Sequence, residues 1–181
     1  MVTPGQTLGA HFLDVTVADF SRYKRLADRA FEQLDAKDFY ARIGDNTNSI
    51  YIIAKHISGN LVSRWTDFLT TDGEKPDRDR ESEFAEEKKT KTEILAMWER
   101  GWKTLFDTLS TLSETDLLET VCIRSEELTV LRAIVRASDH IAYHVGQILM
   151  LARHVKGKDW KWLTIAPGES DKYLLQPPGG G

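Results

Sequence analysis

Two histidines one helical turn apart, His140 and His144, are the residues of this chain whose types and spacing best suit chemistry. Side chains four residues apart lie on the same side of an α-helix, close enough for both imidazoles to reach one metal ion. Both lie within or at the edge of an apolar stripe, so the imidazoles should point inward. Two explanations stay open: a shared metal ion, or core histidines hydrogen-bonded to other helices. The stripe consists of Val130, Ile134, Ala137, Ile141, Ile148 and Leu151.

A third histidine, His56, lies in the middle of a second amphipathic segment, beside its apolar stripe. Alone, such a histidine is more often a half-buried residue with ordinary hydrogen-bond partners. Beside an inward pair on a neighbouring helix, it becomes a candidate third ligand. Three imidazoles and one open position are the arrangement of catalytic zinc-type centres. The sequence therefore predicts a divalent transition-metal site formed by His56, His140 and His144, with Zn, Ni or Fe favoured and Co or Cu also compatible with imidazole.

Two amides and an arginine are the candidate residues for binding a cofactor or substrate at this centre. Asn60 follows His56 by one turn and Gln147 follows His144 by nearly one turn, so both amides should lie on the ligand faces of their helices. There they could orient a bound water or a substrate, although an exposed amide pair is an equally serious interpretation. Arg64 is expected near the mouth of the site.

No residue near the histidines is an evident general base. Asp139 projects about 100° away from His140 on a helix, so it cannot be assumed to support that ligand. Tyr143 is one residue off the ligand face, which favours a structural role. Arg64 and Asp67 are three residues apart, and a solvent-exposed ion pair between them is the default expectation.

Four amphipathic segments should position these residues. Helical spacing of apolar residues predicts helices over residues 8–34, 48 or 49 to 69, 84 or 90 to 112, and 129–154. Residues 35–48 are predicted to be a loop with one short helical turn at 38–41. Residues 119–124 are rich in β-formers and predict an extended connection or a small hairpin. His11 and His154 lie near helix ends, where a surface or capping role explains them better than metal ligation.

Two further segments have less regular patterns. Residues 70–83 contain glycine, proline and many charges, which predicts a long solvated connection. Arg78 and Arg80 in it could face a ligand carboxylate or phosphate, but the mixed charges favour a solvated face. After Gly157, the apolar residues Trp160, Trp162, Leu163 and Ile165 are expected to fold back on the helices or on a partner chain. The terminal residues 176–181 should not pack.

Composition excludes several classes of protein. The chain has 181 residues, 41% hydrophobic and 29% charged, with a net charge of −4. These values are typical of one soluble globular domain over residues 1–181, with a core at about 8–167 and a C-terminal tail at 168–181. They give no electrostatic basis for binding nucleic acid or an anionic membrane. The single cysteine, Cys122, excludes an intramolecular disulfide framework. We find no signal peptide or membrane span, so a cytoplasmic location is expected.

Taken together, these patterns predict an all-α fold, a four-helix bundle in which side chains on facing helices build a metal site. Two runs also carry a resemblance to a known family: Asn48–Pro76, with His56 and Asn60, and His140–Ile148, with His-x-x-x-His-x-Gly-Gln. With a looser match at Trp160–Pro167, the chain resembles the DinB/YfiT-like superfamily, in an uncharacterised branch. The resemblance covers residues from about 8 to 167.

The resemblance implies an up-down-down-up four-helix bundle, commonly a homodimer. It also implies a divalent metal held by one histidine from the second helix and two from the fourth, which correspond to His56, His140 and His144. Characterised relatives include transferases and isomerases that depend on low-molecular-weight thiols such as bacillithiol or mycothiol, and metal-dependent hydrolase roles have been suggested.

Two hypotheses of different classes follow. The first is a metal-dependent enzyme acting on a small molecule, as a thiol-dependent transferase or as a hydrolase. The second is a non-catalytic binding or dimerisation module that the metal stabilises. Only three ligands are evident, whereas a structural zinc site normally has four, and this favours the enzyme.

Overall fold

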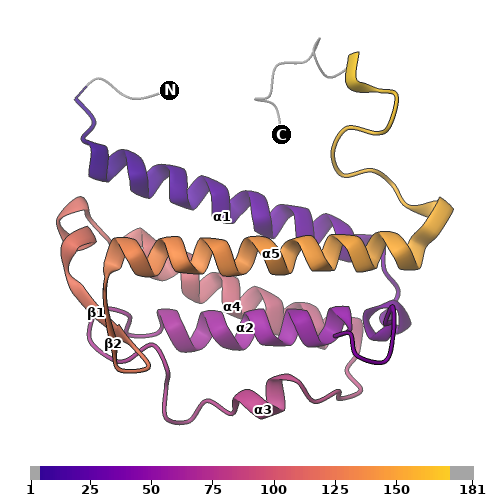
Figure 1. The fold of residues 1–181 in the computed structure, drawn as a ribbon, viewed down its shortest axis with the longest axis horizontal. Coiled ribbons are helices and arrows are strands. Elements are labelled where there is room, and N and C mark those ends of the chain that lie inside the picture. Colours follow the sequence, from indigo (N-terminus) through magenta and orange to yellow (C-terminus); the bar gives the residue numbers. More distant parts are fainter. Residues whose placement is uncertain (1–4, 172–181) are drawn as a thin grey trace.

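The computed structural model of the protein describes residues 5–171, which are mostly helical. The four long helices are α1 (Leu8–Glu32), α2 (Ile50–Trp65), α4 (Lys91–Thr111) and α5 (Val130–Lys156), and α3 (Arg80–Glu83) is one short turn. In Figure 1, α1 and α5 run in one direction and α2 and α4 in the opposite direction. The predicted all-α class is confirmed. None of the helices within residues 5–171 has the length and apolar character needed to cross a membrane.

The predicted helix starts are confirmed by their caps. The Ser49 side chain accepts a hydrogen bond from Ile52 N at the start of α2, and the Thr129 side chain accepts one from Arg132 N at the start of α5. Thr90 begins α4 with a capping box. The predicted end of the second helix at Leu69 was wrong, because α2 ends at Trp65 and Asp67 adopts a left-handed backbone conformation with φ 48°.

The core is densest between α2 and α4, where large aromatic side chains are fully buried. Trp98 and Trp102 of α4 have no exposed surface, and their rings meet edge to face with centroids 5.4 Å apart. Gly101 lets the two helices approach closely, because a Cβ at this position would lie 2.9 Å from the Ser58 Cα. This contact fixes α2 against α4 on one side.

A small hairpin joins α4 to α5, as one of the two predicted alternatives. After the 3₁₀ helix η2 (Glu114–Leu118), strands β1 (Thr120–Ile123) and β2 (Glu126–Thr129) pair antiparallel. The two turn residues, Arg124 and Ser125, both have positive φ. Asp72 accepts hydrogen bonds from both of their backbone N–H groups, at 2.8 and 2.7 Å, and so ties the hairpin to the connection after α2.

The prediction that residues 70–83 form a solvated connection was wrong for Arg78 and Glu83. Glu83, the last residue of α3, is only 5% exposed, and the Arg78 side chain is equally buried. Opposite charges can be buried when they pair with each other, and sequence periodicity does not reveal such pairs. Figure 1 shows α3 running alongside α2, on the face away from α1. Arg80 is exposed, as expected.

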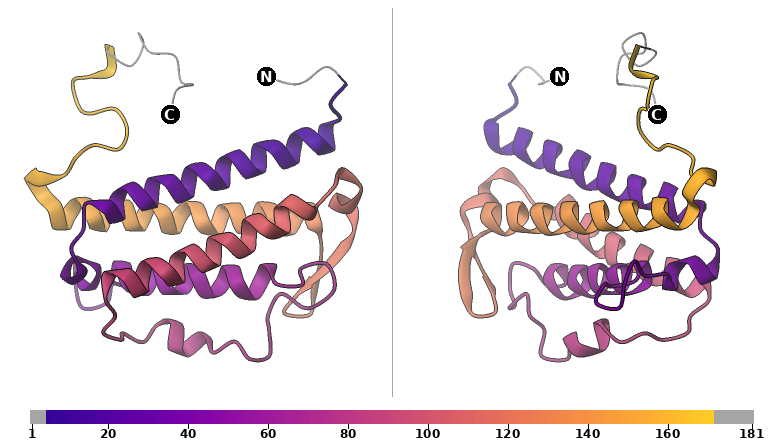
Figure 2. Two further views of the ribbon diagram at one scale, coloured as in Figure 1. Left: turned by 180° about the vertical axis from the view of Figure 1, so that it is seen from behind. Right: turned by 45° about the vertical axis from the view of Figure 1, so that its right-hand side comes forward.

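The segment after α5 folds back on the helices, as predicted. It begins with the 3₁₀ helix η3 (Gly157–Asp159), and another 3₁₀ helix, η1 (Ala36–Tyr40), gives the predicted turn after α1. Trp160 and Leu163 pack against the core, and Arg29 donates a hydrogen bond to the Leu163 carbonyl. Trp162 and Ile165 remain more than a third exposed. Figure 2 shows this segment leaving the far end of α5. The predicted non-packing residues 176–181 lie outside the described range.

Candidate metal centre

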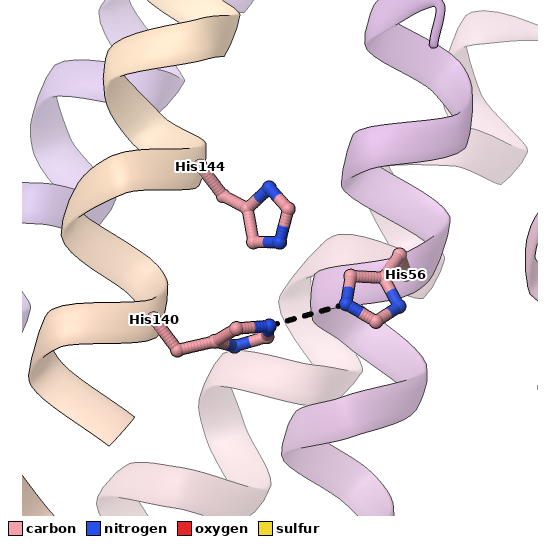
Figure 3. A group of neighbouring side chains, drawn as sticks. All are labelled: His56, His140 and His144. Carbon is pink, nitrogen blue, oxygen red and sulfur yellow. Dashed lines mark hydrogen bonds between the residues drawn. The ribbon is translucent and has the colours of Figure 1, made fainter. Parts of the chain in front are cut away.

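The three predicted ligand histidines lie together between α2 and α5. His56 comes from the middle of α2, and His140 and His144 come from successive turns of α5, as Figure 3 shows. One nitrogen of each ring lies within 4.8 Å of the other two. His56 Nε2 and His140 Nε2 are 3.2 Å apart. Three imidazoles at these separations could hold one metal ion.

The orientation of His56 is fixed by a buried carboxylate. His56 Nδ1 lies 2.8 Å from Glu83 Oε2, a donor and acceptor pair if the imidazole carries its proton on Nδ1. Glu83 is in turn held by Arg78, whose Nε and Nη2 donate to the two carboxylate oxygens at 2.8 and 2.9 Å. With Nδ1 donating, His56 Nε2 presents its lone pair toward His140 and His144. Carboxylate–histidine pairs of this kind typically orient metal-bound histidines.

The charge of Glu83 is favoured by its partners. Burial by itself would raise the pKa of this carboxyl, but the hydrogen bonds from His56 and Arg78 outweigh burial and lower the pKa below its usual value. Gly59 makes room for the carboxylate, because a Cβ at this position would lie 2.5 Å from Glu83 Oε1. Glu83 therefore stays ionised in a site shaped to accept it.

His144 is oriented by an exposed partner. Its Nδ1 lies 2.8 Å from Gln147 Oε1, so the amide oxygen can accept a hydrogen bond from a protonated Nδ1. The other nitrogen, His144 Nε2, is buried and has no hydrogen-bond partner within the described residues. A buried polar atom without a partner costs free energy unless a ligand satisfies it. His144 Nε2 is thus available for a metal ion.

The environment favours neutral imidazoles on α5. Burial, reinforced by His144 and His56, lowers the pKa of His140 to about 3. Burial also lowers the pKa of His144 to about 4, against the opposing effect of its hydrogen bond to Gln147. Metal ions bind the neutral form of imidazole, so low pKa values keep both side chains ready for ligation at neutral pH. The donor set of this cluster therefore fits a divalent transition metal.

The histidines open into a cavity of about 490 Å³ between α2, α5 and the hairpin. Asn60 and Arg64 line it, as expected of residues one and two turns after His56. Gln147 does not line it, and its contact with His144 gives it an orienting role instead. Arg64 pairs with Glu74 at 3.3 Å, not with Asp67, so the expected exposed pair was wrong. Tyr143 lines the cavity and is 55% exposed.

Sequence reasoning missed Glu83 and left Arg78 in a solvated role. Both belong to a charged segment with no apolar periodicity, and only four residues of it form a helix. The one available signal was the cap of that turn, where the Asp79 side chain accepts from Ser82 N. That cap predicts a helical start but not that the carboxylate four residues later reaches His56.

Comparison with known proteins identifies a family for the chain. Residues 7–169 match the family described as "Protein of unknown function (DUF1572)", and the chain belongs to this family. Neither the curated proteins nor the solved structures contain a match. The family covers the helices, the hairpin and all three histidines, and it supplies no function for them.

Proposed function

We propose that this protein is a divalent-metal-dependent enzyme in which His56, His140 and His144 bind Zn, Ni or Fe. The observation that carries the proposal is the convergence of three imidazole nitrogens at the inner end of a cavity. The cluster found in residues 5–171 contains three ligands, where a structural zinc site normally has four. Bound there, a metal ion would supply Lewis acidity and lower the pKa of a thiol or water at its free position.

The reacting nucleophile should come from outside the chain. Among the described residues, the cavity lining contains no serine, threonine, cysteine or lysine, and its side chains of nucleophilic type are the three proposed ligand histidines, Asp139 and Tyr143. A low-molecular-weight thiol or a water molecule can fill this role. We favour a transferase that uses such a thiol, with Asn60 and Arg64 contacting the bound molecules. A metal-dependent hydrolase, with water as the nucleophile, is the second candidate on the same observation.

The fold supports a wider assignment as well. We infer an up-down-down-up four-helix bundle, as in the DinB/YfiT-like superfamily that the sequence resembles, and the order and directions of the four long helices support this inference. We infer that the DUF1572 family is a branch of that superfamily. A homodimer in the cytoplasm is part of the same proposal, and its oligomeric state can be measured by sedimentation.

The first test is the metal content of protein purified without a metal-affinity tag. We expect close to one metal ion per chain in the wild type and loss of that metal in His56→Ala, His140→Ala and His144→Ala. His154→Ala is the matched control, because His154 is an exposed histidine on the same helix, α5. Absence of metal from the wild type, even after reconstitution, would refute the proposal and leave a helical binding module.

The second test separates an open site from a closed one. Cobalt-substituted protein should change its absorption spectrum when a low-molecular-weight thiol is added, because sulfur can enter the open coordination position. Electrophilic substrates are then screened with the responding thiol, and ester or amide substrates are screened without it. No spectral change with any thiol, together with a large fall in melting temperature on chelation, would indicate a structural metal.

A further inference from the structure

The cavity next to the three histidines is polarised along its length. On α2, His56, Asn60 and Arg64 follow one another at intervals of four residues, and all three line the cavity. On α5, Arg132, Arg136, His140 and His144 do the same. Figure 1 shows that α2 and α5 run in opposite directions. The residue order along the two helices therefore brings their histidines together at one end of the cavity and their arginines at the other.

Arginines dominate the charged residues of the lining. Five arginines contribute to it and Asp139 is its one acidic residue, although the chain as a whole has a net charge of −4. Two carboxylates outside the lining offset part of this charge: Glu74 pairs with Arg64 and Arg124, and Glu126 pairs with Arg136. The five arginines are Arg64, Arg80, Arg124, Arg132 and Arg136.

Three guanidinium groups retain unused hydrogen-bonding capacity. Arg80 and Arg132 make no side-chain hydrogen bond or ion pair with any residue in the range 5–171. The Arg64 side chain is only 12% exposed, and its Nη1 is buried without a partner. Burial lowers the pKa of Arg64 to about 10, since Glu74 compensates only part of the cost. A buried donor without an acceptor is costly, so this end of the cavity favours an anionic ligand.

Apart from Asp139 and Tyr143, the remaining wall of the cavity is apolar. It is formed by Trp65, Phe68, Phe84, Ile123, Ala133 and Ala137. Apolar walls with a few convergent charged groups are typical of sites for small organic molecules. A guanidinium also binds carboxylate and phosphate groups with two parallel hydrogen bonds, which gives both affinity and orientation.

We propose that this cavity binds a small organic anion whose carboxylate or phosphate group pairs with Arg64, Arg132 and Arg136. A helical turn rises about 5.4 Å, so Arg136 lies about one turn and Arg132 about two turns from His140. The anionic group therefore sits roughly 5–11 Å from the histidine cluster, and the apolar part of the ligand lies between them. That the other end of the ligand reacts at the metal rests on the proposed function, whereas anion binding itself does not.

The test is calorimetric titration of metal-free and metal-loaded protein at about 0.15 M salt, where weak surface attraction is screened. The probes are 4-phenylbutyrate, phenyl phosphate and the neutral 4-phenylbutyramide. We expect both anions to bind metal-free protein and the amide to bind at least about tenfold more weakly, since hydrogen bonds between two charged groups are stronger than those to a neutral amide. The carboxylate and the phosphate probe together show which group the arginines prefer.

Arginine variants locate the anion. Arg64→Gln and Arg132→Gln should each weaken anion binding by about tenfold or more. Arg153→Gln should bind as the wild type does, because Arg153 lies near the other end of α5 and contacts the Trp162 ring. Arg64→Gln also removes a partner of Glu74 and can lower stability, so Arg132→Gln, which removes no partner, keeps the test decisive.

Three results would overturn the inference. The first is equal affinity for the amide and the anions. The second is an anion affinity that is unchanged in both Arg64→Gln and Arg132→Gln. The third is anion binding that requires the metal and has the same affinity in both variants as in the wild type. Metal content of the same samples is measured in parallel. Arginine-dependent anion binding by a protein that takes up no metal would refute the proposed enzyme and support the anion site.

Discussion

The two faces of α2 differ in how closely they pack against the neighbouring helices. Toward α4, the helix packs closely, because Gly101 lets the two backbones approach at Ser58, whose hydroxyl donates to the Ala54 carbonyl within α2. Toward α5, the same helix presents His56, Asn60 and Arg64 to a cavity of about 490 Å³. The difference indicates that the closely packed face holds α2 in place, while the other face carries charged and polar groups and a cavity, both of which cost stability.

Truncating the buried aromatic core of α4 should have the largest effect. Trp98→Ala removes a fully buried ring that packs edge to face on Phe31 and donates to Asp28 Oδ1 at 2.8 Å. We expect a loss of about 3–5 kcal/mol in the free energy of unfolding, measured by urea denaturation. Met150→Ala, on the exposed surface of α5, should change stability by less than about 0.5 kcal/mol. Metal content per folded molecule should be unchanged, and a metal loss like that of His56→Ala would contradict the division between the two faces.

Removing the charge of Glu83, which contacts His56, should have the next largest effect, and it should lower the affinity for the metal. Glu83→Gln keeps the size of the side chain but weakens the preference for a protonated Nδ1 on His56, because a neutral amide accepts a hydrogen bond less strongly than a carboxylate and can also donate one. Substitutions of residues that support metal ligands typically cost about 10–100-fold in metal affinity, and we expect a loss in this range by competition with a chelator. Glu81→Gln, on the exposed side of the same turn, is the control. Unchanged affinity in Glu83→Gln would show that His56 needs no orienting partner.

Crowding Glu83 without changing it gives a finer test. Gly59→Ala places a methyl group 2.5 Å from the present position of Glu83 Oε1, so the carboxylate must shift. We expect a loss in metal affinity of about tenfold, the lower end of the range above. Gly146→Ala is the matched control on α5, where an added Cβ would meet no atom within 4 Å. It should leave metal affinity intact and add about 0.5–1 kcal/mol of stability through helix propensity.

The exposed partner of His144 should matter least. Gln147→Ala removes the hydrogen bond to His144 Nδ1, and an exposed neutral hydrogen bond contributes about 0.5–1.5 kcal/mol. We therefore expect a loss of metal affinity of about 2- to 12-fold, measured as for Glu83→Gln. A loss larger than that of Glu83→Gln would reverse the order proposed here, in which the buried carboxylate fixes the centre more firmly than the exposed amide.

Local sequence determined the helices and the three histidines. Apolar spacing and the caps at Ser49, Thr90 and Thr129 depend on neighbours within one or two turns, so a single chain read in order reveals them. The same locality explains why His140 and His144 could be paired in advance. The end of α2 was predicted wrongly because apolar spacing continues to Phe68, whereas Asp67 turns into the left-handed conformation and its carbonyl accepts from Thr70 N and Thr71 N.

Only the tertiary structure decided which groups support and surround the histidines. Glu83 lies 27 residues from His56 in sequence, in a segment whose charges predict exposure, yet it is buried because Arg78 and His56 satisfy it. The arginines that face the cavity come from α2, α3, α5 and the hairpin; helical spacing links Arg132 with Arg136 on α5, but no local pattern links arginines of different elements. Long-range pairing of charges depends on which surfaces the folded helices bring together, and that information resides in packing and not in periodicity.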